Sequence, residues 1–515
     1  MPETPENYCL LQGFEWNVPA DQKHWQRLQN VLPDLKKIGI DNVWLPPACK
    51  GSGGSNANGY DIYDLYDLGE FDQKGSRSTK WGPLEDLNNL VQKAEEVGVG
   101  LYFDAVLNHK AGADNKEKCR VIEVNQDDRT KEIGEPFEIE AWLGFDFPGR
   151  GDQYSSQKYH WEHFSGTDYD AGNDKTGIYR ILGDHKYWSS SVGDESGNAD
   201  FLMFADIDYS HPEVINDVIH WGEWVVKKLK LRGFRFDACQ HFSERFTNEF
   251  VSHLEKVFGA KKLFLVGEFW SGDVGEMLEY LEGMEHKFSL YDSPLLNNFS
   301  RLSTTENADL RTVFDGSLVQ ARPESAVTVV MNHDTQPGQT VATPIEGFFK
   351  PIAYALILLR SQGYPSIFYG DLYGMRGDTP EPPSCGDKLP HLVLARKLFA
   401  YGDQDDYFDG GDDDSSPQTC LGFVRRGTPD RKDGCAVVLS NAGPGQKRMF
   451  VGEMHAGEVW TDVLGWQGDE VEIGSDGFGT FMCSATSVSV WVNRDAERRK
   501  EIDDLSFDSD IYAKA

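Results

Sequence analysis

Three acidic residues lie at the ends of short apolar segments, and their types suit the cleavage of a glycosidic bond. Asp237 ends the segment Gly-Phe-Arg-Phe-Asp, Glu268 ends Phe-Leu-Val-Gly-Glu, and Asp334 ends Asn-His-Asp. One carboxyl group can attack the sugar, a second can protonate the leaving oxygen, and a third can orient the substrate. An acidic residue after a strand is also a common helix N-cap, so the three carry weight only together.

The charges near these carboxyl groups suggest different roles for them. Arg235 precedes Asp237 by two residues, so on a strand both side chains face the same side. A neighbouring positive charge lowers the pKa of a carboxyl group, which predicts an ionised Asp237 that can act as a nucleophile. Glu268 has no such cation nearby in the sequence, so we expect it to keep its proton and act as the general acid.

The first 400 residues contain eight apolar runs that are typical of buried parallel strands, with amphipathic stretches between most of them. The runs span residues 8–16, 42–46, 100–108, 233–238, 263–269, 286–291, 325–332 and 365–369. Helices are predicted over 25–38, 84–97, 212–229 and 244–257. This alternation predicts an α/β fold with a (β/α)8 TIM barrel, in which catalytic groups lie at the carboxyl ends of the strands. A doubly wound open sheet is the alternative, but no GxGxxG follows the first run, so its dinucleotide-binding form has no support.

Two regions do not follow this alternation. Residues 109–203, rich in Gly, Asp, Ser and Trp, are too long for a structureless loop and predict a domain inserted after strand 3. After residue 400, short alternating segments with turn residues predict a C-terminal antiparallel β-sandwich. We therefore expect the barrel over 1–108 and 204–400, inserted domain B over 109–203, the sandwich over 401–497 and a charged, frayed tail over 498–515.

The overall charge limits the possible partners. The 515 residues carry 84 acidic and 50 basic side chains, a formal net charge of −34. Such a surface repels phosphate backbones and anionic membranes, so neither nucleic acid nor membrane is an expected partner. The polar, acidic N-terminus does not resemble a secretory signal, which predicts a cytoplasmic protein with its eight cysteines reduced. We expect it to be a monomer.

The ordered motifs resemble those of the α-amylase family of glycoside hydrolases (family 13), especially the bacterial liquefying enzymes and their signal-less intracellular fungal relatives. The matching segments are 13–16, 59–71, 104–109, 202–212, 233–241, 267–270 and 332–334. The resemblance implies retaining endo-hydrolysis of α-1,4-glucosidic bonds in starch, glycogen or maltooligosaccharides through a covalent glycosyl-enzyme. The alternative is a 4-α-glucanotransferase that uses the same three carboxylates.

Two further alternatives are weaker. A catalytically inactive glucan-binding relative would be expected to lack one of the three carboxylates, and all three are present. The inserted domain and the C-terminal sandwich argue against an α-glucosidase or isomaltase.

The resemblance assigns a role to each matching residue. Asp237 would be the nucleophile, Glu268 the general acid and then base, and Asp334 the group that binds sugar hydroxyls at subsite −1. Tyr60 would stack on a glucose ring. The substrate-binding residues would be Tyr60, His109, Arg235, Gln240, His241, Trp270 and His333. Gln240 stands where many α-amylases have a lysine, which removes a positive donor from the acceptor side.

The resemblance also implies one structural Ca²⁺ that clamps the inserted domain to the barrel. The matching ligands are Asn108, Asp200, Asp206 and the backbone carbonyl of His241, the oxygen donors that a hard cation prefers. The bacterial liquefying enzymes often hold a Ca–Na–Ca cluster instead. Three positions that would help to bind it carry neutral hydroxyls, so we expect the second calcium and the sodium to be absent or weak. These positions are Ser165, Ser189 and Ser210.

Overall fold

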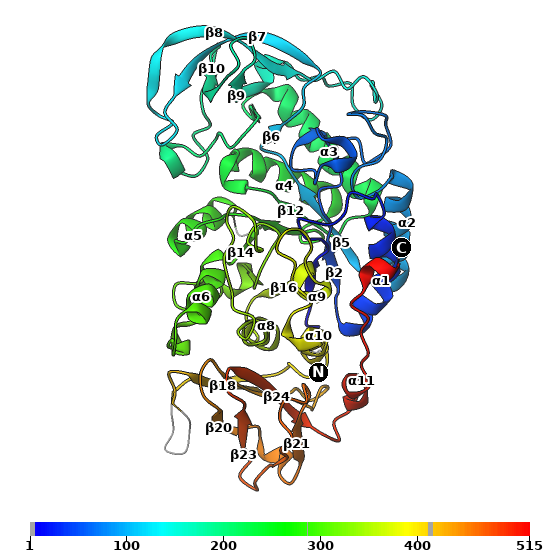
Figure 1. Cartoon of the computed structure of the whole chain (residues 1–515), viewed down its shortest axis with the longest axis vertical. Helices are drawn as coiled ribbons and strands as arrows, with labels where there is room; N and C mark the ends of the chain where they lie inside the picture. Colours follow the sequence, from blue (N-terminus) through cyan, green and yellow to red (C-terminus); the bar gives the residue numbers. More distant parts are fainter. Residues whose placement is uncertain (1–5, 286, 410–415, 515) are drawn as a thin grey trace.

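The computed structural model describes residues 6–285, 287–409 and 416–514. The predicted run at 286–291 and the expected bounds at residues 1 and 515 therefore lie partly outside the described residues. Figure 1 shows three parts along the long axis: a sheet from the inserted region at the top, a barrel in the middle and the C-terminal sheets at the bottom.

Eight parallel strands close into a barrel in the order β1-β16-β15-β14-β13-β12-β5-β2. Their bounds are β1 (Leu10–Gln12), β2 (Asn42–Trp44), β5 (Gly100–Ala105), β12 (Gly233–Phe236), β13 (Phe264–Gly267), β14 (Ser289–Tyr291), β15 (Ala326–Val329) and β16 (Tyr364–Phe368). Each predicted run overlaps one of these strands, so the (β/α)8 barrel is confirmed. The runs are almost continuously apolar because both faces of each strand are covered.

Helices surround the barrel (Figure 1). They are α1 (His24–Ile38), α2 (Leu84–Val97), α3 (Pro212–Leu229), α4 (Glu244–Phe258), α5 (Val274–Gly283), α6 (Ser293–Thr304), α7 (Leu318–Ala321), α8 (Lys350–Leu359), α9 (Tyr369–Tyr373) and α10 (Leu389–Leu398). Local chemistry marks their ends: Ser243 Oγ accepts a hydrogen bond from Phe246 N at the start of α4, and Gly39 ends α1 with a φ of 107°. Across the described residues, none of the helices has the length and apolar content that a bilayer crossing needs.

The region after β5 forms a six-stranded antiparallel sheet in the order β6-β11-β9-β10-β7-β8. Its strands are β6 (His109–Lys110), β7 (Asn115–Val124), β8 (Glu132–Gly144), β9 (Phe164–Asp170), β10 (Lys175–Ile181) and β11 (Ala205–Ile207). The first and last of them pair with each other, with Asp206 opposite His109. The chain therefore leaves and re-enters the barrel at neighbouring points, which confirms the inserted domain after strand 3.

Two antiparallel sheets follow the barrel, as the alternating segments predicted. One has the order β17-β18-β19-β24-β21-β22 and the other pairs β20 with β23. Their bounds are β17 (Gln404–Tyr407), β18 (Cys420–Arg425), β19 (Cys435–Ser440), β20 (Gly445–Phe450), β21 (Val459–Asp462), β22 (Val471–Glu472), β23 (Phe478–Cys483) and β24 (Ser487–Asn493). Val438, Met449 and Phe481 belong to the buried apolar cluster between the two sheets.

The charged tail is folded onto the molecule, so the expectation that it is frayed is wrong. It contains the helix α11 (Arg499–Asp503) and the 3₁₀ turn η9 (Ile511–Lys514), and η9 contacts α1 (Figure 1). Ile502 and Ile511 are both fully buried. Leu505, Phe507 and Tyr512 also pack against the core, so apolar contacts hold this stretch although its other residues are mostly charged or polar.

Candidate active site

The pairing of neighbouring strands brings the predicted catalytic segments to one end of the barrel. β12 pairs with β5 in a register that sets Arg235 opposite Asp104. β12 also pairs with β13, and beyond the paired residues Glu268 N–H donates a 2.9 Å hydrogen bond to Phe236 O. Asp237 and Glu268 therefore follow equivalent positions of adjacent strands, at the carboxyl ends where barrel enzymes place their catalytic groups.

A single buried guanidinium group connects three carboxylates at this end. Arg235 Nη1 donates hydrogen bonds of 2.7 Å to Asp104 Oδ1 and to Asp237 Oδ1. Arg235 Nη2 donates to Glu268 Oε2. Glu268 has no cation nearby in the sequence, but Arg235 on the adjacent strand supplies one in space.

Burial has the largest effect on the pKa values of the three predicted catalytic carboxyl groups. Removal from water raises the pKa values of Asp237, Glu268 and Asp334, and the charge of Arg235 offsets part of each rise. The predicted lowering of the Asp237 pKa is wrong in its net direction, because desolvation outweighs the neighbouring guanidinium. For Glu268 the raised pKa favours the protonated form, which a general acid needs.

Asp104 is a site residue that the sequence reasoning missed. It is buried, and its Oδ2 accepts hydrogen bonds from Trp44 Nε1 at 2.9 Å and from Tyr60 OH at 3.0 Å. Burial raises its pKa to about 7. The available signal was its place in the predicted strand 100–108, at the start of the matching segment 104–109.

Three parallel rings form an aromatic platform, which we define as Trp16, Tyr60 and His333. Their centroids lie 6.0 Å apart for Trp16–Tyr60, 5.0 Å for Tyr60–His333 and 5.9 Å for Trp16–His333, with interplanar angles of 7°, 8° and 12°. In a stacked column the two outer rings would be about twice as far apart as neighbouring rings. The three centroid distances are similar, so the rings lie in a triangular patch. His109 borders it by donating from Nε2 to Tyr60 O at 2.8 Å. Trp16 was missed, although it closes the segment 13–16.

Gln12 fixes the tautomer of His333. Gln12 Nε2 donates to His333 Nδ1 at 3.0 Å, so Nε2 carries the ring proton, and that nitrogen lies 3.2 Å from Asp334 Oδ2. Burial lowers the His333 pKa to about 3, so the ring is neutral. The Asp334 side chain is 34% exposed and is thus accessible to a substrate.

The predicted leaving-group residues are adjacent to Glu268 but are held mainly by backbone contacts. Trp270 N–H donates to Gln240 Oε1 at 3.0 Å. His241 Nδ1 donates to Ala199 O at 2.6 Å. The Gln240 side-chain oxygen therefore holds the backbone of the loop that carries Trp270.

Comparisons with known proteins agree with this geometry. The model "Alpha amylase, catalytic domain" matches residues 21–397, and "Alpha-amylase C-terminal" matches residues 435–492. The chain belongs to the α-amylase family. It is 43% identical over 491 residues to the glucan 1,4-α-maltohexaosidase of Bacillus sp. strain 707, which covers 95% of this chain and 93% of that protein.

Two more relatives extend this comparison. The cytoplasmic α-amylase of Escherichia coli K12 is 41% identical over 497 residues, covering 94% of this chain and 99% of that protein. The crystal structure of an α-amylase from Geobacillus thermoleovorans complexed with acarbose aligns with a TM-score of 0.62 at 17% identity, covering 95% of this chain and 98% of that one. At that identity the likeness concerns the fold alone.

The α-amylase family typically binds calcium, and the four predicted ligands lie on segments that adjoin where the inserted sheet joins the barrel. They are Asn108, Asp200, Asp206 and His241. Asn108 directly precedes β6, which pairs with Asp206 of β11. The His241 ring is bonded to the carbonyl of Ala199, which directly precedes Asp200.

The chemistry of these residues fits a hard cation. Asn108 Oδ1 is buried and finds no hydrogen-bond partner among the described residues. Burial raises the Asp200 pKa to about 7, and burial together with the charge of Asp200 raises that of Asp206 well above its usual range. Two buried carboxylates beside an orphaned amide oxygen form a donor set that a divalent cation would neutralise.

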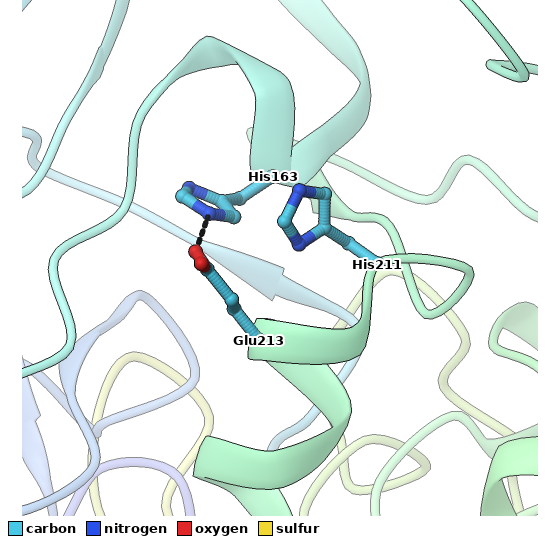
Figure 2. Close-up of side chains that lie close together, drawn as sticks. All are labelled: His163, His211 and Glu213. Atoms are coloured by element: carbon cyan, nitrogen blue, oxygen red, sulfur yellow. Dashed lines mark hydrogen bonds and ion pairs between the residues drawn. The ribbon is translucent and has the colours of Figure 1, made fainter.

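A histidine–glutamate group elsewhere in this α-amylase chain does not fit a metal. Figure 2 shows His163 and His211 beside Glu213 at the start of α3. His163 Nδ1 accepts a hydrogen bond from His160 N at 2.9 Å, so its proton is on Nε2 and points to Glu213 Oε2 at 3.2 Å. A metal would need the lone pair of that protonated nitrogen. The group therefore serves as a hydrogen-bonded contact.

Proposed function

We propose that this chain is a retaining endo-acting α-amylase that hydrolyses α-1,4-glucosidic bonds in starch, glycogen or maltooligosaccharides. The observation that carries the proposal is the Arg235 guanidinium, which holds Asp237 and Glu268 together on adjacent strands of an α-amylase-family barrel. An inactive relative would have no need to keep these two carboxyl groups at one buried cation.

In the proposed reaction Asp237 attacks the anomeric carbon while Glu268 transfers its proton to the departing glycosidic oxygen. A covalent glycosyl-enzyme results. Glu268, now ionised, removes a proton from water, and the water oxygen displaces Asp237 from the sugar. The two inversions give net retention. Asp334 would bind hydroxyls of the sugar next to the bond being cut, and its partial exposure supports this role.

The surrounding residues would bind the glucan. The aromatic platform supports a stacking role for Tyr60, because an apolar sugar face packs well on a flat ring. His109, Arg235 and His333 would line the subsite at the bond, since all three are buried around Tyr60 or the carboxylates. Gln240, His241 and Trp270 would lie toward the leaving group.

We further propose one Ca²⁺ site made of side-chain oxygens of Asn108, Asp200 and Asp206 and the carbonyl of His241. When bound, the ion supplies positive charge and a cross-link between the inserted domain and the barrel. The buried acidic pair and the orphaned Asn108 oxygen support this assignment.

A lysine supports the absence of a second calcium and of sodium. Lys186 Nζ donates hydrogen bonds of 2.9 Å to Asp208 Oδ2 and to Phe164 O, and the side chains of Lys186 and Asp208 are each only 7% exposed. Ser210 Oγ also donates to Asp208, at 2.6 Å. An ammonium group thus already neutralises Asp208, a carboxylate close enough for its charge to raise the pKa values of Asp200 and Asp206.

We propose that the protein is cytoplasmic and monomeric, with the glucan as its partner and no nucleic acid or membrane. Its acidity and the name of the Escherichia coli relative support this assignment. The proposed domains are the barrel over 1–108 and 204–400, domain B over 109–203, the sandwich over 401–497 and the tail over 498–515. The antiparallel pairing of β6 with β11 supports the start of domain B at residue 109, and β11 (Ala205–Ile207) extends the same sheet a few residues past 203.

The test is a time course with maltoheptaose in which every product is resolved and new reducing ends are counted. A hydrolase gives shorter sugars and steadily rising reducing ends, with products initially in the α-configuration. Longer sugars at nearly constant reducing ends would instead identify a 4-α-glucanotransferase. The Asp237→Asn protein is the control for contaminating activity.

A further inference from the structure

A strap formed by residues 505–514 reaches back from the C-terminal sheets to the barrel. It follows α11, crosses the side of the molecule and ends in η9 against α1 (Figure 1). Ile511 anchors it and is fully buried. Both matched family models end before the strap begins, at residues 397 and 492. The strap therefore lies outside the parts of the chain that define the family.

Tyr512 on the strap holds the loop that follows α9. The guanidinium carbon of Arg376 in that loop lies 3.5 Å from the centroid of the Tyr512 ring. The guanidinium carbon of Arg27 on α1 lies 4.8 Å from the same centroid. Tyr369 OH donates to Tyr512 OH at 3.5 Å. One ring thus joins the first helix of the barrel to the loop after its last strand.

The same loop is tied to the segment after β1. Arg376 N–H donates to Glu15 Oε1 at 3.4 Å, and Arg376 O accepts from Asn17 Nδ2 at 2.9 Å. Gly377 has a φ of +93°, and a Cβ there would lie only 2.5 Å from Asn17 Nδ2. The two segments therefore touch closely, and a shift of Arg376 would move Glu15 or its contacts.

Glu15 carries this connection to the aromatic platform. It is fully buried, and its Oε2 accepts from Gln336 Nε2 at 3.0 Å. Gln336 Oε1 in turn accepts from the backbone N–H of Trp16, also at 3.0 Å. Trp16 stacks beside Tyr60 and His333. A continuous series of contacts thus runs from Tyr512 to the rings proposed to bind the glucan.

We propose that the strap positions Trp16 through Tyr512, Arg376 and Glu15, and so sets the affinity of the enzyme for α-glucan chains. Tyr512 is then a positioning residue that never touches the substrate. This inference rests on the function proposed above. A cavity of about 300 Å³ lies between the strap and α10, lined in part by Leu389, His391, Leu505 and Phe507. Tyr512 is only partly buried, so replacing its ring tests the contact with Arg376 without removing the fully buried anchor Ile511.

The experiment compares Tyr512→Ala, Tyr512→Phe and Arg376→Ala with the unaltered chain in the hydrolysis of maltoheptaose. Loss of the ring should raise KM roughly 3- to 10-fold while kcat stays within about twofold, because only substrate positioning is affected. Tyr512→Phe keeps the ring and should restore KM. The double variant Tyr512→Ala/Arg376→Ala should be no worse than the poorer single variant, since both act through one contact.

Tyr8→Ala is the matched control. Tyr8 is also a tyrosine near a chain end, with Lys397 Nζ 5.9 Å from its ring centroid. It precedes β1 and so lies at the opposite end of the barrel from the candidate site. Its KM should not change. An unaltered KM in Tyr512→Ala, an equal rise in the control, or additive effects in the double variant would each overturn the role of the strap. If the unaltered chain fails to cleave maltoheptaose, the proposed function fails instead, so the two failures are distinguishable.

Discussion

Replacement of Lys186 by methionine tests whether an ammonium group substitutes for a metal ion beside the proposed calcium site. The methionine keeps most of the apolar stem but removes both 2.9 Å hydrogen bonds, to Asp208 and to Phe164 O. Asp208 would remain buried, and the backbone N–H and hydroxyl of Ser210 would still donate to its Oδ1. Leaving one charge of a buried ion pair without its partner costs about 3–5 kcal/mol.

This cost can be converted into a shift of the melting temperature. With about 2.1 cal/mol/K per residue, the 515 residues have an unfolding entropy near 1.1 kcal/mol/K if they unfold as one unit. The expected drop is therefore about 3–5 °C, measured by differential scanning calorimetry at fixed calcium. The double variant Lys186→Met/Asp208→Asn should recover most of the lost melting temperature, because the unpaired charge of Asp208 is then absent.

Lys175→Met is the matched control, because it breaks a 2.7 Å ion pair with Glu123 on the same inserted sheet, where the lysine side chain is 55% exposed. An exposed pair contributes about 0–1 kcal/mol, so this melting temperature should move by about 1 °C or less. Equal drops in the two lysine variants, or no recovery in the double variant, would refute the idea of an internal cation.

Three other predictions concern the catalytic end and its support. Asp237→Asn should lower kcat by at least ~10⁴-fold yet still bind maltoheptaose in calorimetry; residual covalent turnover would contradict its role as nucleophile. Ala238 has a φ of 44°, so Ala238→Gly should keep activity, whereas Ala238→Val should displace Asp237 and lower kcat by up to ~10²-fold. Burial lowers the pKa of His24 from 6.5 to about 3, so the unfolded chain binds one more proton between these values and stability falls as the pH falls. Between pH 6.5 and 4.5 the unfolding free energy of His24→Gln should fall less steeply than that of the unaltered chain, by about 1.4 kcal/mol per pH unit. Equal slopes of unfolding free energy against pH in the two proteins would disprove this prediction.

The barrel was readable from the sequence because its strands are buried on both faces. Apolar runs such as the one around β12 stand out between amphipathic helices, and helix boundaries such as Pro212 and Gly98 have local chemical causes. The same reasoning placed Asp237, Glu268 and Asp334 at strand ends. Local signals of this kind need no knowledge of distant contacts.

Contacts between distant segments could not be read in this way. The bond from Arg235 to Glu268 depends on the register of β12 with β13, which no pattern within either strand reveals. Trp16 joins Tyr60 and His333 only because three loops meet at one barrel end. The tail looked unstructured because two isoleucines in a charged stretch form no periodic pattern, although both find a buried site.

The order in which the chain is made gives the two ends of the molecule a further importance. β1 pairs with β16, so the barrel cannot close until residues 364–368 have left the ribosome. The face of α1 that η9 covers stays open until residues 511–514 emerge. At ~5–20 residues per second, synthesis of the 515 residues takes roughly 26–100 s, and α1 waits for its cover through nearly all of it. This face of α1 is therefore exposed to other chains for most of synthesis, and a truncated message would leave it permanently uncovered.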